Sequence, residues 1–162
     1  MTTICAIDNG VTGGITILHP DKSVFYSTTP VKKVKNYTKV EAHLHRIDTK
    51  KLETILCKLP KDTMVFIERP MINPGRFKAS ISAVRALEAT LIVLEDLNLK
   101  YRYVDSKEWQ SYMLPDIVGS EELKKASLAK GKELYPDLEY DKDADSLLLA
   151  LWVKETNQNL CQ

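Results

Sequence analysis

The sequence lacks a long hydrophobic run, an excess of either charge and any paired arrangement of cysteines. Its longest apolar stretch, from Leu147 to Val153, is far shorter than a membrane span requires. The three cysteines, Cys5, Cys57 and Cys161, are an odd number without the spacing of a zinc site or a disulfide framework. We therefore expect a protein of a reducing, cytoplasmic compartment, with no membrane segment and no signal peptide.

Length and charge allow one globular enzyme but do not by themselves indicate its substrate. The 162 residues suit one domain, 1–162, with a sizeable core, and the sequence has no internal repeat, low-complexity tract or linker. The net charge of +1 gives no sign of a nucleic-acid binder. Carboxylates gathered around metal ions would offset basic patches, so the positions of the charges matter more than their sum.

Apolar patterns and turn signals predict three strands, then a helix, a strand, a helix, a strand and two main helices. The strands are predicted at 3–7, 14–18, 23–28, 63–67 and 101–104, and the helices at 48–59, 78–98, 120–135 and from 141–145 onward, with a short helical turn at 109–114. The polar, lysine-rich stretch 30–46 is predicted to be a long, mobile loop. The expected fold is α/β, with a five-stranded mixed sheet flanked by helices on both faces.

The long helix at 78–98 carries two stripes at helical spacing. The apolar stripe is predicted to face the core, and a stripe of small residues beside it would let the helix pack closely. The first contains Val84, Leu87, Leu91 and Leu94, and the second contains Ala79, Ala83, Ala86 and Thr90.

Acidic residues stand at the predicted ends of several elements. Asp8 ends the first strand and Glu68 follows the fourth, while Asp141 and Asp145 stand at the start of the last helix. In an open α/β sheet, side chains at the ends of neighbouring central strands converge on one edge. Four close carboxylates repel one another without a cation, and hard Mg²⁺ or Mn²⁺ ions prefer such oxygen ligands. The pattern therefore predicts a site for two metal ions that serves phosphodiester hydrolysis.

Each acidic residue also has a purely structural interpretation. Asp8 in an Asp-Asn-Gly turn could bond its own backbone, and Glu68 could pair with Arg69. Asp141 and its neighbours could compensate the dipole of the last helix. The coincidence of all these positions favours the metal site.

Helix geometry ranks the acidic residues before the last helix. Residues four apart lie about 40° from one another on a helix, and residues two apart lie about 160° from one another. Asp141 and Asp145 therefore share a face if the helix has begun by Asp141. Asp143 would point away unless it caps the helix, so it is the substitute for Asp141 as the fourth ligand.

Several segments, in order along nearly the whole chain, resemble phage-type RuvC-like Holliday junction resolvases of the ribonuclease H-like superfamily. They are 6–14 around Asp8, 66–70 around Glu68, 73–80, 106–110, 123–127 and 143–150 around Asp145. The resemblance implies a ribonuclease H-like sheet, a homodimer, hydrolysis with two metal ions and paired nicks across a four-way DNA junction. It assigns Asp8, Glu68 and Asp145 to the first, second and last acidic metal-ligand positions.

The chain departs from the family pattern at two places. Many bacterial relatives carry the third acid three residues before the last, where this chain has Lys142. Other branches use the four-residue spacing that Asp141 satisfies. The aromatic wedge that bacterial relatives carry shortly after the glutamate is replaced here by Met71 and Ile72.

Contacts with DNA phosphates are expected from lysine and arginine clusters that flank the metal site. Phe77, Trp109 and Tyr112 could stack on unpaired bases, although Trp109 could equally belong to the core. His43 and His45 lack nearby residues that would complete a metal site. The expected DNA-binding residues are Arg76, Phe77, Lys78, Arg85, Lys124, Lys125, Lys33 and Lys35, with Lys32, Lys39, Lys130 and Lys132 in the same clusters.

Two isoleucines outside the main apolar stripe suggest a place for a second subunit, and three other functions compete with the resolvase interpretation. Ile81 and Ile92 lie opposite the main apolar stripe near Arg85 and could pack against a partner copy. The actin and sugar-kinase fold also opens with a strand, an aspartate and a glycine turn, but it needs two domains, so no nucleotide cofactor is expected. The remaining alternatives are a ribonuclease H or exonuclease on the same fold, and a non-catalytic junction-binding protein.

Overall fold

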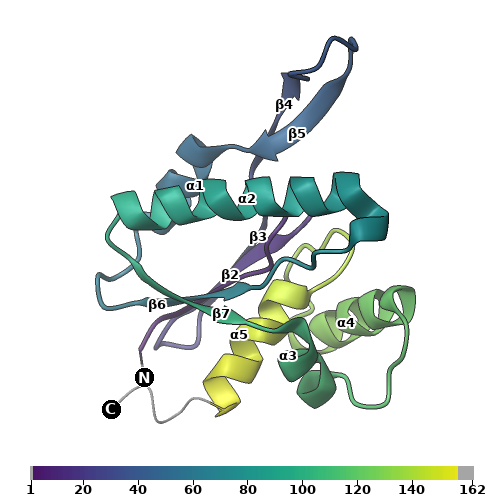
Figure 1. Cartoon of the computed structure of the whole chain (residues 1–162). Coiled ribbons are helices and arrows are strands. Elements are labelled where there is room, and N and C mark those ends of the chain that lie inside the picture. The colour runs from purple at the N-terminus through teal and green to yellow at the C-terminus, as the bar shows by residue number, and fades with distance from the viewer. Residues whose placement is uncertain (1, 157–162) are drawn as a thin grey trace.

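In the computed structural model, which describes residues 2–156, a mixed five-stranded sheet runs through the middle of the molecule (Figure 1). Its strands are β1 (Ile4–Ile7), β2 (Gly14–Leu18), β3 (Val24–Thr28), β6 (Met64–Glu68) and β7 (Lys100–Val104). Their order is β3-β2-β1-β6-β7, with β1–β2 and β2–β3 antiparallel and β1–β6 and β6–β7 parallel. The predicted five-stranded mixed sheet is confirmed.

Alternate residues of β1 enter two separate hydrophobic clusters. Ile4 and Ala6 belong to one cluster, and Cys5 and Ile7 belong to the other. Side chains of a strand point alternately to the two faces of a sheet, so a strand that is apolar throughout must be covered on both faces. All of β1 is buried, as this rule requires.

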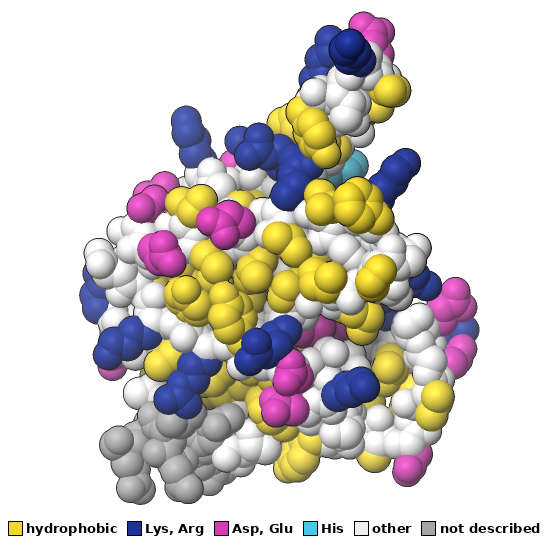
Figure 2. Space-filling view, in the orientation of Figure 1, with side chains coloured by type: hydrophobic (Ala, Val, Ile, Leu, Met, Phe, Trp, Pro, Cys, Tyr) yellow, Lys and Arg dark blue, Asp and Glu magenta, His cyan; other side chains and the backbone are white. Residues whose placement is uncertain are grey.

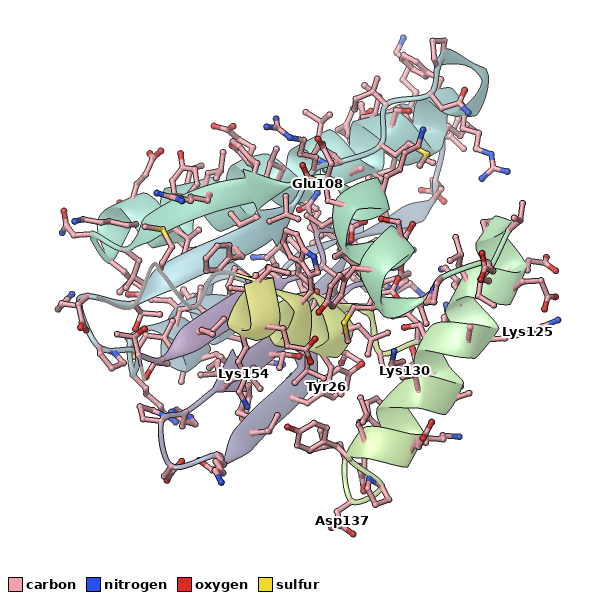
Figure 3. The ribbon with its side chains drawn as sticks, turned by 90° about the horizontal axis from the view of Figure 1, so that it is seen from below. Tyr26, Glu108, Lys125, Lys130, Asp137 and Lys154 are labelled. Carbon is pink, nitrogen blue, oxygen red and sulfur yellow. The ribbon has the colours of Figure 1, made fainter. Side chains whose placement is uncertain are left out.

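Helices cover both faces of the sheet, as predicted. One face packs against α1 (Thr49–Leu56) and α2 (Phe77–Asp96), and a short 3₁₀ turn, η1 (Pro74–Arg76), leads into α2. The other face is covered by the remaining three helices, of which α5 lies directly on β1 and β2 (Figures 1 and 3). These helices are α3 (Ser106–Met113), α4 (Ser120–Leu134) and α5 (Asp145–Thr156).

The prediction of a mobile loop at 30–46 is wrong, because this stretch forms an antiparallel hairpin that projects from the body (Figure 1). Its strands are β4 (Val31–Lys35) and β5 (His43–Ile47). The pairing aligns Val31 with Ile47 and Val34 with Leu44, so apolar residues face each other across the ribbon. The lysine-rich composition hid this pattern. Lysine is tolerated in a two-stranded ribbon whose side chains reach solvent.

The apolar stripe predicted for the long helix faces the core except at its first residue: Leu94 is buried, and Leu87 and Leu91 are partly buried against the same core cluster. Val84 is 45% exposed, whereas Ala86, Thr90, Val93 and Leu94 are buried. Small side chains let the helix backbone approach the sheet closely, and Thr90 donates its hydroxyl hydrogen to the carbonyl of Ala86. Residues of both predicted stripes, Leu94 of the apolar one and Ala86 and Thr90 of the small one, are therefore on the buried side of α2.

Two expectations about composition can be compared with residues 2–156. Within them, none of the helices is both long enough and apolar enough to cross a membrane. Cys5 is buried and Cys57 is exposed, and both are free thiols. Cys161 lies outside the described residues.

Candidate metal centre

The parallel pairing of β1 with β6 brings Asp8 and Glu68 to the same edge of the sheet. Ile7 pairs with Ile67, so Asp8, directly after β1, and Glu68, the last residue of β6, stand side by side at the carboxyl ends of these strands. The amide of Asp8 donates a 3.0 Å hydrogen bond to the carbonyl of Gly14, which closes the turn after β1. A Cβ atom at Gly13 would lie 2.0 Å from the carbonyl oxygen of Asp8, so only glycine fits there.

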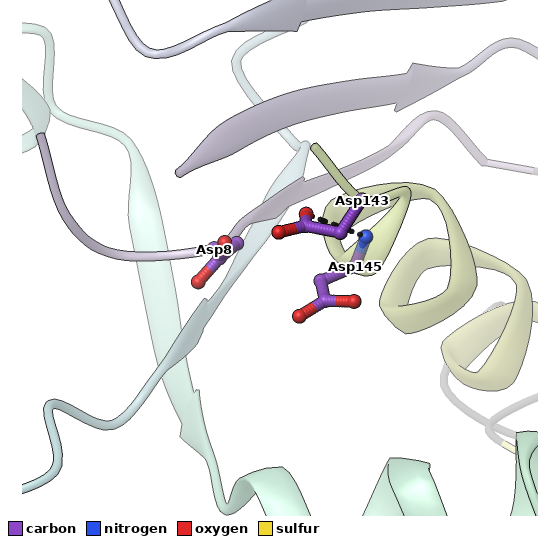
Figure 4. Close-up of side chains that lie close together, drawn as sticks. All are labelled: Asp8, Asp143 and Asp145. Carbon is purple, nitrogen blue, oxygen red and sulfur yellow. Dashed lines mark hydrogen bonds between the residues drawn. The ribbon is translucent and has the colours of Figure 1, made fainter. Parts of the chain in front are cut away.

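The segment before α5 brings two further carboxylates to this edge. The main chain at Asp143 and Ala144 is held from two sides: Tyr26 donates its hydroxyl hydrogen to the carbonyl of Asp143 at 3.0 Å, and Ala144 donates its amide hydrogen to Ser127 Oγ at 3.1 Å. Asp145 is the first residue of α5, and its amide donates to Asp143 Oδ1 at 3.3 Å (Figure 4). Asp143 therefore caps the turn that starts the helix.

Asp8, Asp143 and Asp145 form one cluster (Figure 4). Each offers a carboxylate oxygen, and these oxygens lie within 4.8 Å of one another. Asp143 is buried, and Asp8 and Asp145 are partly buried. Three aspartates from two distant parts of the chain thus meet at one point.

The structure does not bring Asp141 into this cluster. The choice of Asp141 depended on the last helix having begun by that residue, and this condition is not met, since α5 begins at Asp145. Asp141 is exposed, as is Lys142, and the shared helical face on which its selection rested does not exist. The substitute, Asp143, lies in the cluster, and its carboxylate folds back onto the first turn of α5.

Glu68 is held by a residue whose role the sequence left open. The indole Nε1 of Trp109 donates a 2.8 Å hydrogen bond to Glu68 Oε2, and Trp109 is fully buried. This placement excludes base stacking by Trp109 and favours its alternative interpretation as a core residue. A buried tryptophan requires an acceptor for its N–H, and this requirement was the one signal in the sequence that pointed to such a partner.

The carboxylates raise one another's pKa values. Burial, followed by the charges of Glu68, Asp145 and Asp143, holds the pKa of Asp8 well above its ordinary value. Burial also raises the pKa of Glu68 to about 7, against the lowering effect of the Trp109 hydrogen bond.

Burial and a neighbouring carboxylate also raise the pKa of Asp145, whereas the positive charge of Lys124 lowers it. Burial and the charge of Asp143 raise the pKa of Asp145 to about 6. Lys124 lowers the pKa values of Asp8 and Asp145, and its Nζ lies 3.9 Å from Asp143 Oδ2. This lysine is half exposed, so it compensates the cluster only in part.

The cluster lies in an open cleft of about 250 Å³. Glu68 lines this cleft together with the three aspartates, so four carboxylates face one space. Their hard oxygen donors, their mutual repulsion and their incomplete compensation by Lys124 fit one or two divalent cations such as Mg²⁺ or Mn²⁺. The other lining residues include Asn9, Thr12, Met71, Gln110, Ser120 and Lys124.

Comparison with solved structures identifies the arrangement of strands and helices. The structure of Thermus thermophilus RuvC in complex with a Holliday junction substrate matches with a TM-score of 0.55 at 13% identity, over 95% of this chain and 93% of that chain. Another structure of Thermus thermophilus RuvC matches with a TM-score of 0.51 at 12% identity, over 96% of each chain. The chain has the ribonuclease H-like fold of RuvC.

Sequence comparison alone does not reach this result. No family model matches the chain, and no curated protein matches it in sequence. The yeast mitochondrial Holliday junction resolvase aligns over 98% of this chain and 82% of its own, at 16% identity and a TM-score of 0.46. The fold class expected from the motifs around Asp8, Glu68 and Asp145 is confirmed by the two RuvC structures, at low sequence identity.

The residues expected to bind DNA lie at different distances from the cleft. Lys124 lines it, whereas Lys125 pairs with Glu122 at 2.9 Å and points away from the body (Figure 3). Arg76, Phe77 and Lys78 are exposed where η1 meets α2. Further along α2, the guanidinium of Arg85 lies over the ring of Tyr37, 5.4 Å from its centroid. Lys33 and Lys35 are exposed on β4 of the projecting hairpin.

Met71 follows Glu68 by three residues and lies at the acidic cleft. It is 75% exposed and lines the cleft, and the neighbouring Ile72 is 58% exposed. Two exposed apolar side chains thus stand beside the acidic cluster.

Proposed function

We propose that this protein is a divalent-metal-dependent endonuclease that resolves four-way junctions and other branched DNA as a homodimer. The observation that carries the proposal is the meeting of Asp8, Asp143 and Asp145 within 4.8 Å of one another on the RuvC fold. Glu68 completes the set from the neighbouring strand. The similarity to a RuvC structure that holds a Holliday junction substrate supports branched DNA as the substrate class.

In this proposal the four carboxylates hold Mg²⁺ or Mn²⁺, two ions per site. The bound ions supply charge stabilisation at the scissile phosphate and lower the pKa of the attacking water. Asp143 lies just before α5 and Asp145 is its first residue, joined by the hydrogen bond from the Asp145 amide to Asp143 Oδ1, and Asp8 is fixed by the turn to Gly14. Trp109 orients Glu68 through its indole hydrogen bond. Lys124 is near enough to exchange its contact with Asp143 for a substrate phosphate.

The remaining contacts with DNA are assigned to exposed residues around the cleft. Arg76 and Lys78 are charged and free to reach phosphates on the η1–α2 side, and Phe77, which is 70% exposed, is suited to stack on a base that is unpaired at the branch point. Lys125 and Arg85 extend the basic surface away from the cleft.

The proposed dimer uses the outer face of α2. Ile81, Val84 and Ile92 are exposed and follow one side of the helix, and hydrophobic side chains gather over α2 in the view of Figure 2. A row of this kind on a surface helix is typical of a protein interface. A symmetric pair of subunits would present two metal centres, which two cuts at one junction require.

The test compares a labelled four-way junction with a linear duplex of matched sequence, in Mg²⁺, in Mn²⁺ and in EDTA. We expect paired, symmetric nicks on the junction only, lost in EDTA and in the variants Asp8→Asn, Asp143→Asn and Asp145→Asn. Asp141→Asn is the matched control, because it makes the same change two residues from Asp143 on an exposed side chain. It should cleave like the wild type.

The other outcomes identify the competing functions. Cleavage of the RNA strand of a hybrid duplex would replace the proposal with a ribonuclease H. Equal cleavage of duplex and junction would leave the metal centre in place but remove the selectivity for branches. Tight junction binding without a product in either metal would make the protein a junction-binding protein.

A further inference from the structure

The hairpin of β4 and β5 has two different faces. Cross-strand partners point to the same side of a two-stranded ribbon, so the pairing register sorts the side chains. Lys33 pairs with His45 and Lys35 pairs with His43, which gathers four exposed polar side chains with basic nitrogens on one face. The other face carries the pairs Lys32 with Arg46 and Val34 with Leu44.

The face with Lys33 and Lys35 is the one that turns toward α2 at the base of the hairpin. Ile47 lies on this face two residues after His45, and it is buried in the core beneath α2. A hollow of about 230 Å³ lies between the hairpin base and α2, and His45, Arg46 and Arg85 line it. Arg85 also lies over the ring of Tyr37, which follows β4, so the hairpin is braced against α2.

The corner between the β4–β5 hairpin and α2, which contains this hollow, is positively charged. The residues 31–47 contain Lys32, Lys33, Lys35, Lys39 and Arg46 against the single carboxylate Glu41. Dark-blue lysine and arginine side chains lie on the projecting arm and around its base (Figure 2). Among the residues that line the hollow, one is acidic, Glu88, and two are arginines, Arg46 and Arg85.

The corner is continuous with the metal centre through the turn after β1. Val11 lines the hollow, whereas Asn9, Thr12 and Gly13 of the same turn line the acidic cleft. Asn9 donates a 3.1 Å hydrogen bond to the carbonyl of Ala83, which fastens this turn to α2. A polymer that passes over the cleft can therefore continue into the corner without leaving the protein surface.

We propose that the corner between the hairpin and α2 binds the phosphate backbone of a duplex DNA arm, away from the phosphate that is cut. Lys33, Lys35 and Arg85 make the contacts, and His43 and His45 add hydrogen-bond donors. Lysine and arginine contacts with phosphates are independent of base sequence, which suits a protein that must hold an arm of any sequence. The inference rests on the proposed function for the identity of the substrate, but it concerns binding alone.

The experiment measures binding without cleavage. The affinity for a fluorescent four-way junction with arms of about 20 base pairs is followed by anisotropy in EDTA over a series of salt concentrations. The test variant is Lys33→Gln/Lys35→Gln. Lys32→Gln/Lys39→Gln is the control, because it removes the same charge from the same hairpin: Lys32 lies on the other face of the ribbon, and Lys39 lies in the loop between β4 and β5. Lys33→Arg/Lys35→Arg keeps the charge, and circular dichroism and the thermal midpoint verify the fold of each variant.

We expect the test variant to bind on the order of tenfold more weakly near 0.1 M salt, with a salt slope smaller by about two, since each phosphate contact contributes about 0.9 to the slope. The arginine variant should bind like the wild type, and the control should lose much less. Shortening the arms to about 8 base pairs should remove the difference between test variant and wild type. Equal losses in test and control variants, or an unchanged slope in the test variant, would overturn the inference.

The two proposals fail in different ways. If the wild type cleaves junctions but the salt slopes of all variants coincide, the corner does not bind DNA and the nuclease stands. If the slopes differ as expected but no metal supports cleavage, the corner binds DNA and the catalytic proposal is wrong.

Discussion

The indole nitrogen of Trp109 lies 2.8 Å from Oε2 of Glu68, so a core residue of α3 fixes a carboxylate at the end of β6. The hydrogen bond leaves the other carboxylate oxygen of Glu68 available to a cation. It also links the packing of α3 on the sheet to the geometry of the acidic cleft. A residue without access to substrate thereby becomes a positioning residue of the proposed centre.

Replacing Trp109 with phenylalanine should lower metal affinity more than it lowers stability. The aromatic body remains, but Glu68 loses its donor, and partners of metal ligands typically contribute 10- to 100-fold in affinity or activity. We expect the Mg²⁺ concentration for half-maximal cleavage to rise about tenfold. Trp152→Phe, at a partly buried position on α5, is the control and should leave this concentration unchanged. An unchanged requirement in Trp109→Phe would show that the hydrogen bond is only structural.

The metal-free protein should lose stability as the pH rises through the acidic cluster's titration. Folding raises the pKa of Asp145 from 3.8 to about 6 and that of Glu68 from 4.5 to about 7. Groups with raised pKa values stabilise the fold below their unfolded values, and this contribution disappears as pH rises through the folded values. In EDTA, urea denaturation should therefore show stability falling from about pH 4, near the unfolded pKa values, to about pH 7, near the folded ones.

The variant Asp145→Asn and added Mg²⁺ distinguish the titration of the acidic cluster from the titration of other groups. Asp145→Asn should be more stable than the wild type by about 1 to 2 kcal/mol at pH 7.5, and this difference should shrink as the pH falls toward about 4. Mg²⁺ should raise the thermal midpoint of the wild type at pH 7.5 and raise that of Asp145→Asn much less. Parallel pH profiles for the two proteins in EDTA would contradict the cluster's electrostatics.

Gly131→Ala should destabilise the protein although it lies inside α4. In an open helix the change from glycine to alanine stabilises by about 1 kcal/mol. Here a Cβ atom at Gly131 would lie 2.4 Å from Cβ of Ala144 and 3.2 Å from the ring of Tyr140. We expect a loss of about 1 to 3 kcal/mol in urea denaturation.

The same substitution should also impair cleavage, because the displaced segment carries Asp143. Lys132→Ala, one residue away on an exposed part of α4, is the control and should change neither property. A Gly131→Ala protein as active and as stable as the wild type would show that α4 and the segment before α5 separate easily.

Charge on the outer face of α2 should prevent dimer formation. Val84→Glu adds a carboxylate to the exposed apolar row without touching the core, so the monomer should keep its fold and its thermal midpoint. Light scattering coupled to gel filtration should give twice the chain mass of 18.4 kDa for the wild type and the single chain mass for the variant. Val118→Glu, at an exposed valine outside α2, should leave the mass of the wild type unchanged. A wild type that elutes as a monomer would remove the homodimer from the proposal.

Local sequence patterns were sufficient to predict the strands whose residues are almost all apolar, and the acidic residues at their ends. The buried strands at 3–7 and 63–67 are apolar after an initial threonine, and each is followed by a polar turn or proline that ends it. Asp8 and Glu68 could therefore be assigned to strand ends from the sequence. Parallel neighbours in an α/β sheet then bring such ends together, which is why this half of the acidic cluster was predictable.

Tertiary structure decided the other half of the cluster and the hairpin. Asp141, Asp143 and Asp145 all suit a helix start, and the first turn of α5 is set by contacts of residues remote in sequence: Tyr26 and Ser127 hold the main chain at Asp143 and Ala144. The pairing of β4 with β5 likewise depends on contacts across the ribbon rather than on composition. The sequence alone determined which residues can hold a cation. Packing determined which of them face the same cleft, because a side chain's direction follows from where the whole backbone is held.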